Sequence, residues 1–188
     1  MNNSGRKVEP MAMFPRMKPA HVMVAFGFGV LSTLIASWAS LGLMLGNSLV
    51  MLPMSHDNED IALILMAVMV APFVEELAKP IGLYFLHAED KPDLELKEWA
   101  FLGAMAGLGF AIMENFLYAI STLEYGADAS FWLLGLRFLL PLHMIATAIS
   151  GFGFGLWVKT GKAKYFASCM LVAMLLHAAF NLAAVWVG

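Results

Sequence analysis

Residues 61–87 read IALILMAVMVAPFVEELAKPIGLYFLH and form a long apolar stretch. A helix needs about 20 mainly apolar residues to cross the hydrocarbon core of a bilayer, and this stretch exceeds that length. It is too long for a strand and lacks a strict alternation of apolar and polar positions. Three charged side chains, Glu75, Glu76 and Lys79, nevertheless interrupt it near its middle. The stretch therefore predicts a membrane helix that carries ionisable groups into the bilayer, where such groups are costly and commonly functional.

The rest of the chain repeats this pattern. Similar apolar stretches occupy residues 20–51, 97–123, 131–158 and 164–187, joined by short polar connections. The 188 residues are 61% hydrophobic and only 13% charged, whereas a soluble domain carries about 25% charged residues. We expect an all-α fold, a polytopic membrane helix bundle of about five transmembrane helices with the lipid bilayer as its surroundings. Residues 20–187 would form a single domain after an N-terminal segment, 1–19, and no basic tract indicates nucleic acid.

The distribution of Lys and Arg predicts the orientation of the bundle. Basic residues gather before the first span, between the second and third, and between the fourth and fifth: Arg6, Lys7, Arg16, Lys18, Lys91, Lys97, Lys159, Lys162 and Lys164. The two remaining connections hold no Lys or Arg. The positive-inside rule then places the N-terminus in the cytoplasm. Trp99 and Trp157 are expected at the inner interface of the membrane, and Trp132 and Trp186 at the outer one.

Small residues within the spans predict close helix packing. Gly103 and Gly107 have the GxxxG spacing, and Gly151 and Gly155 repeat it in the next span. Small residues at this spacing allow two helix backbones to approach each other in a membrane.

Four spans each carry a polar side chain to a similar depth. Glu75, Glu114, His143 and His177 lie within about five residues of one another when counted from the outer ends, or about 8 Å along the helix axes. Convergence of four helices on one level indicates a shared site in the membrane interior.

A purely structural interpretation of these polar groups is also open. Lys79 follows Glu75 by four residues and Glu76 by three, so one of the two glutamates can neutralise it locally. A single lysine cannot compensate Glu114 as well. A purely structural network therefore explains some of the polar groups within the spans, and the others are candidates for a catalytic role.

The residue types suit hydrolysis of an amide bond. Adjacent glutamates in a medium of low dielectric favour sharing of a proton, which prepares one of them as a general base for water. A histidine can orient that water, and Asn181, one turn after His177, can stabilise an oxyanion with a histidine N–H. Two histidines with one or more carboxylates are equally the ligand set of a catalytic zinc ion, although no HExxH motif is present.

Four motifs carry a resemblance to a known family. They read Glu75-Glu76-Leu77-Ala78-Lys79 (EExxK), Phe110 to Glu114 followed by Asn115 (FxxxE-N), His143 with Thr147, and His177 to Asn181 (HxxxN). In this order, on successive spans, they resemble the PrsW-type intramembrane proteases, relatives of the CAAX prenyl endopeptidases and their bacterial homologues. The CAAX enzymes carry a histidine at the position of Glu114, so the chain is more similar to the PrsW branch.

The resemblance implies a multi-pass intramembrane endopeptidase of a prokaryotic plasma membrane, acting on a membrane protein or a membrane-associated peptide. It implies six catalytic residues: Glu75, Glu76, Glu114, His143, His177 and Asn181. The enzyme would depend on glutamate without a cofactor, or on zinc held by four residues: His143, His177, Glu75 and Glu114. A proton- or ion-coupled transporter and a non-catalytic membrane scaffold are the alternative functions for the same polar cluster.

Overall fold

The computed structural model describes residues 13–51, 64–122 and 141–187. Within these ranges the chain is helical and contains no strand. Its elements are α1 (Pro19–Met51), the π-helical turn η2 (Met66–Val70), α3 (Ala71–Ala78), α4 (Ile81–Glu89), α5 (Leu96–Thr122), α7 (Leu142–Thr160) and α8 (Ala163–Val187). The prediction of an all-α helical bundle is confirmed for the described part of the chain.

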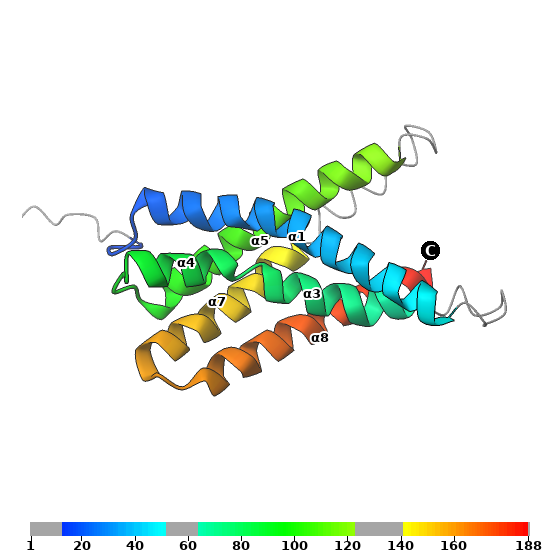
Figure 1. Ribbon diagram of the computed structural model, residues 1–188. Coiled ribbons are helices and arrows are strands. Elements are labelled where there is room, and N and C mark those ends of the chain that lie inside the picture. Colours follow the sequence, from blue (N-terminus) through cyan, green and yellow to red (C-terminus); the bar gives the residue numbers. More distant parts are fainter. Residues whose placement is uncertain (1–12, 52–63, 123–140, 188) are drawn as a thin grey trace, which may run out of the picture.

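The helices run alternately along one bundle axis, as Figure 1 shows. Helices α1, α5 and α8 begin at the same end of the bundle, and α4 and α7 finish there. The C-terminus lies at the opposite end, near the end of α1. The helix α5 is central, because it packs extensively against both α1 and α7.

In the part of the chain that the structure describes, three helices are long and apolar enough to cross a membrane: Pro19–Gly42 of α1, Leu96–Ile120 of α5 and Ala163–Ala184 of α8. They correspond to the first, third and fifth predicted spans. The fourth predicted span, 131–158, is described only from residue 141 onward. The outer surface of the bundle is also apolar, since large side chains such as Leu171, Leu175 and Leu182 are at least half exposed. The chain is an integral membrane protein.

The described part of the second predicted span is helical but is divided into several elements. Between residues 64 and 89 the chain forms η2, α3 and α4 in succession. Pro72 stands in the first turn of α3, and Pro80 separates α3 from α4. A proline within a helix removes one backbone N–H and its ring clashes with the carbonyl four residues earlier. The short helix α3 is thereby set apart from its neighbours; it carries Glu75 and Glu76, and Lys79 caps its C-terminal end.

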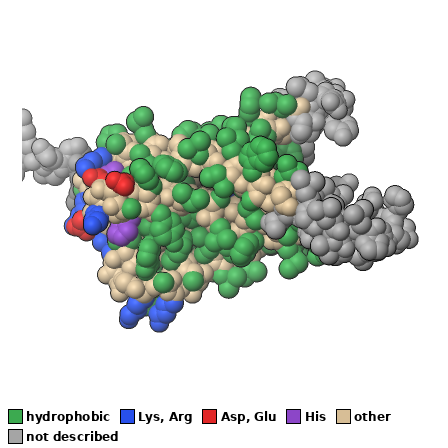
Figure 2. Space-filling view, in the orientation of Figure 1, with side chains coloured by type: hydrophobic (Ala, Val, Ile, Leu, Met, Phe, Trp, Pro, Cys, Tyr) green, Lys and Arg blue, Asp and Glu red, His purple; other side chains and the backbone are tan. Residues whose placement is uncertain are grey.

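Charged side chains gather at one end of the bundle. Figure 2 shows Lys, Arg, Asp and Glu side chains at the end where α1 begins, with hydrophobic side chains covering the middle of this face. Trp99, which was predicted at the inner interface of the membrane, is fully buried against Phe154. Trp157 packs on the same aromatic core. The indole rings thus stabilise the bundle interior at this end.

Helices α5 and α7 are in backbone contact through glycines, as the GxxxG spacing predicted. A Cβ atom added to Gly103 would overlap the carbonyl oxygen of Thr147, and one added to Gly107 would overlap that of His143. These contacts fix the height of His143 relative to α5. At the far end of α7, Gly161 has a φ of 70° and closes the turn into α8. Only glycine adopts such a conformation at little cost.

Candidate active site

The helix α3 presents two buried charges to the bundle interior. Glu76 and Lys79 are three residues apart on one face of the helix, and both side chains are fully buried. Nζ of Lys79 donates to Oε1 of Glu76 at 2.6 Å, and it lies 3.6 Å from Oε2 of Glu75. The sequence left open which glutamate neutralises Lys79. The structure gives the shorter contact to Glu76.

Helix α8 adds a histidine to this pair. His177 is buried, and its Nδ1 lies 2.9 Å from Oε1 of Glu76. A carboxylate only accepts hydrogen bonds, so the ring donates from Nδ1. The other ring nitrogen, Nε2, then has a free lone pair, and it lies 3.8 Å from Oε2 of Glu75.

Helices α5 and α7 supply a second pair of the same kind. Nε2 of His143 lies 2.9 Å from Oε2 of Glu114, so this ring donates from Nε2. The lone pair of Nδ1 consequently points away from Glu114. Nζ of Lys79 donates to this Nδ1 at 2.9 Å and also lies 4.2 Å above the ring of Phe110. The contact between Lys79 and His143 spans 64 residues, and no spacing in the sequence indicated it.

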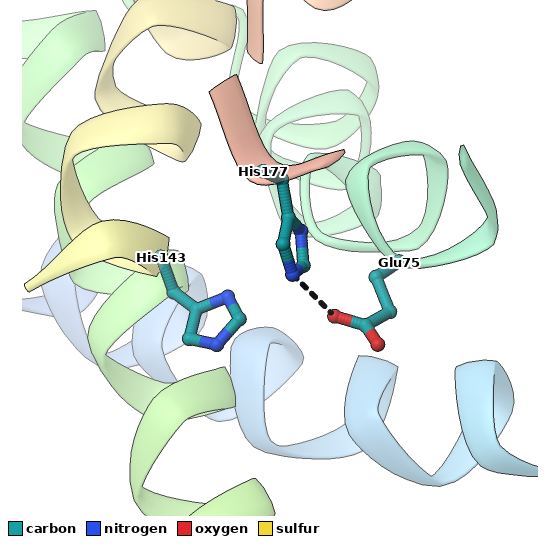
Figure 3. A group of neighbouring side chains, drawn as sticks. All are labelled: Glu75, His143 and His177. Carbon is teal, nitrogen blue, oxygen red and sulfur yellow. Dashed lines mark ion pairs between the residues drawn. The ribbon is translucent and has the colours of Figure 1, made fainter. Parts of the chain in front are cut away.

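Three side chains from three helices therefore face one point. Figure 3 shows Glu75 of α3, His143 of α7 and His177 of α8, with the ion pair between Glu75 and His177 marked. One ligand atom from each of these residues lies within 4.8 Å of the others. The two imidazole rings are edge to face, with their centroids 4.9 Å apart. The predicted convergence of polar groups at one level is present in the described residues.

The donor set fits a divalent metal such as zinc. Two histidines and a carboxylate, with a fourth position left for water, form a common catalytic zinc site. Oε2 of Glu75 is buried and has no hydrogen-bond partner among the described residues. Each histidine also donates the N–H of one ring nitrogen to a carboxylate, which leaves the other nitrogen for a metal, as metal-binding histidines usually do. Glu114, the fourth residue of the predicted ligand set, is not among these three, and its Oε2 lies 2.9 Å from Nε2 of His143.

The remaining predicted residues surround the site. Asn181 follows His177 by one turn on α8 and is partly buried. Thr147 follows His143 by one turn on the same helix face and is fully buried. Beside His143, a pocket of about 70 Å³ is lined by Glu114, Asn115 and apolar side chains that include Leu108, Ile112 and Phe180. The cluster thus borders a small cavity between α5 and α7.

An apolar bundle with a buried set of carboxylates and histidines defines an integral membrane protein with a candidate metal centre. Residues 18–188 match the family described as the PrsW family of intramembrane metalloproteases. The chain belongs to this family, and it is therefore a membrane-embedded hydrolase of the protease class. No curated protein and no solved structure matches the chain at the level required of a relative.

Proposed function

We propose that the chain hydrolyses a peptide bond of a membrane protein or membrane-associated peptide at the cluster of Glu75, His143 and His177. The observation that supports this most strongly is the approach of one ligand atom from each residue to within 4.8 Å in the bundle interior. His143 and His177 are at least nine-tenths buried, so bulk solvent would be excluded from the site. Membership in a protease family gives the reaction class.

Glu75, His143 and His177 would hold the metal ion that the family description implies. Such an ion polarises a carbonyl and makes a water molecule nucleophilic at neutral pH. Glu76 and Glu114 have a different task in this proposal. Each accepts the N–H of one histidine, which orients the ring and fixes the nitrogen that carries the proton.

Different hydrogen-bond partners of the two adjacent glutamates support different roles for them. Oε1 of Glu76 already accepts from Lys79 and from His177. Oε2 of Glu75 lies at the point where the cluster converges and accepts no hydrogen bond from the described residues. In the alternative without a metal, we assign Glu75 to the reacting water; in both alternatives Glu76 is assigned to positioning. Asn181, on the same face of α8 as His177, is assigned to the oxyanion.

We also propose that the charged end of the bundle faces the cytoplasm of a prokaryotic cell. Described basic residues at the helix ends support this assignment: Arg16, Lys18, Lys91, Lys97, Lys159, Lys162 and Lys164. The N-terminal segment would then be cytoplasmic, and all five predicted spans would cross the membrane. The order of the motifs supports the further proposal that the CAAX prenyl endopeptidases share this arrangement, with a histidine where Glu114 stands.

Cleavage of a panel of single-span reporter proteins by the purified protein in detergent tests this function. Wild type should cleave at least one reporter, and Glu75→Gln should lower the rate by about a hundredfold or more. Glu95→Gln is the matched control, because Glu95 is a partly exposed residue at the start of α5, paired with Lys97. A chelator followed by zinc tests the metal. Cleavage by Glu75→Gln at the wild-type rate would refute the assignment.

A further inference from the structure

The ammonium group of Lys79 lies among the atoms that face the candidate metal position. Its side chain is fully buried on α3, and Nζ lies 2.9 Å from Nδ1 of His143 and 3.6 Å from Oε2 of Glu75. These two atoms belong to two of the three residues that would bind the ion. A cation of the protein itself thus contacts the site where a metal cation would lie.

The chemistry of His143 makes the two cations exclusive. Its Nε2 carries the proton donated to Glu114, so Nδ1 offers the one remaining lone pair of the ring. That lone pair accepts the hydrogen bond from Lys79 in this structure. A metal–nitrogen bond of about 2.0–2.1 Å needs the same lone pair. Nδ1 can therefore bind Lys79 or a metal ion, but not both together.

We propose that Lys79 is the internal counter-cation of the metal-free site and that a divalent metal displaces it from His143. This inference rests on the proposed metal site. A lysine side chain that leaves Nδ1 of His143 still has its other partners. Oε1 of Glu76 holds the ammonium at 2.6 Å, and the ring of Phe110 lies 4.2 Å from it. The carboxylates of the site thus keep a positive partner before the metal arrives.

The proposal makes a specific statement about affinity. Lys79 lowers metal affinity both by competing for Nδ1 and by placing a positive charge beside the ion. Lys79→Met removes the competitor and the charge while keeping a long apolar chain. We expect this variant to bind zinc on the order of tenfold more tightly than wild type, in calorimetric titrations of the metal-free protein. Lys97→Met is the control, since Lys97 is half exposed and should leave the affinity unchanged.

The stability of the metal-free protein gives a second measurement. Without Lys79, the buried Glu76 loses its cation, and a buried charge without its partner is strongly destabilising. The metal-free Lys79→Met variant should therefore unfold at a lower temperature than wild type, and zinc should raise its unfolding temperature by more than it raises that of wild type. If the variant does not fold without metal, ¹⁵N spectra of histidine-labelled wild type replace it. They should show His143 protonated on Nε2, and zinc should shift the Nδ1 resonance.

Three results would overturn the proposal. Lys79→Met that binds zinc no more tightly than wild type would show that the lysine does not compete. A proton on Nδ1 of His143 in the metal-free wild type would exclude the hydrogen bond on which the proposal depends. Absence of zinc binding by wild type would remove the metal site itself, and reporter cleavage in the presence of chelator would then show that the protease function stands without it.

Discussion

Nδ1 of His177 donates to Oε1 of Glu76 at 2.9 Å across 101 residues of sequence. This bond joins the last helix, α8, to the short helix α3. The same carboxylate oxygen accepts from Lys79, so three buried ionisable side chains meet at one atom. The two neighbouring glutamates therefore differ in their partners, although the sequence presents them as equivalent.

The different partners predict different losses for the two glutamate variants. Glu76→Gln should destabilise the protein by about 3–5 kcal/mol, because it leaves Lys79 buried without its closest anion. Glu75→Gln should leave stability nearly unchanged and remove activity, because Glu75 has the longer contact of 3.6 Å to Lys79. Thermal unfolding in detergent, beside reporter cleavage, checks both expectations. A stability loss of equal size in the two variants would contradict the distinction.

Glu114 is predicted to act through His143 rather than as a metal ligand. Glu114→Ala removes the acceptor that lies 2.9 Å from Nε2 of His143. Loss of such a supporting carboxylate usually lowers metal affinity by about 10–100-fold. Zinc titration of the purified variant measures this, with His143→Ala as the reference for loss of a ligand. Equal losses in the two variants would place Glu114 in direct contact with the metal instead.

The close approach of α5 and α7 predicts a cost for a single methyl group. Gly107→Ala would drive a Cβ into the backbone carbonyl of His143, so α7 must move and carry the histidine with it. We expect a loss of stability of about 1–3 kcal/mol together with reduced cleavage. Gly27→Ala on α1 is the matched control, because nothing lies within 4 Å of its added Cβ. A control that unfolds as early as Gly107→Ala would show a general effect of replacing a helical glycine.

The charged end of the bundle predicts a dependence of stability on pH. The hydrogen bond from His21, together with the Lys18 ammonium, holds the pKa of Asp90 below its ordinary value, which is near 3.9. A carboxyl whose pKa falls on folding contributes stability above its ordinary pKa and loses it as pH drops through the lowered pKa. Asp90→Asn should therefore lower the unfolding temperature at pH 7.

The difference between Asp90→Asn and wild type should shrink below about pH 4, as the aspartate of wild type becomes protonated. Unfolding temperatures of the two proteins between pH 7 and pH 3 test this. Asp93→Asn controls for the loss of a negative charge at this end, because the Asp93 side chain is largely exposed. A constant difference across this pH range would exclude a role for the charge of Asp90.

The sequence predicted the depth of the site along the helices but not the contacts between its side chains. Helical periodicity placed His143 and Thr147 on one face, and His177 and Asn181 on another, because a helix returns to the same side every 3.6 residues. The packing of three helices decides the contact of Lys79 with His143, and no local spacing reports it. Pro72 and Pro80 indicate possible breaks in the second span, but a proline within a membrane helix is often tolerated as a kink, so the sequence alone does not determine the break at Pro80.

The charged end of the bundle shows the same limit of sequence reasoning. Glu98 was not singled out, yet it is fully buried and accepts hydrogen bonds from the backbone N–H groups of Arg16 and Glu95. It thereby caps the start of α5 and fastens the segment that precedes α1. A capping glutamate near a helix start is visible in a sequence. Its bond to a segment 82 residues earlier is not.

The bond between α3 and α8 bears on how the protein is made. When the second apolar segment leaves the ribosome, Glu76 finds Lys79 three residues away, but His177 belongs to a helix that has not yet been synthesised. Of these two partners, Lys79 can therefore accompany Glu76 into the membrane, where an unpaired charge is costly, and His177 cannot. Biogenesis of the bundle is complete only when the last helix arrives, so a nascent chain that stops before α8 would carry an unfinished polar centre exposed to membrane quality control.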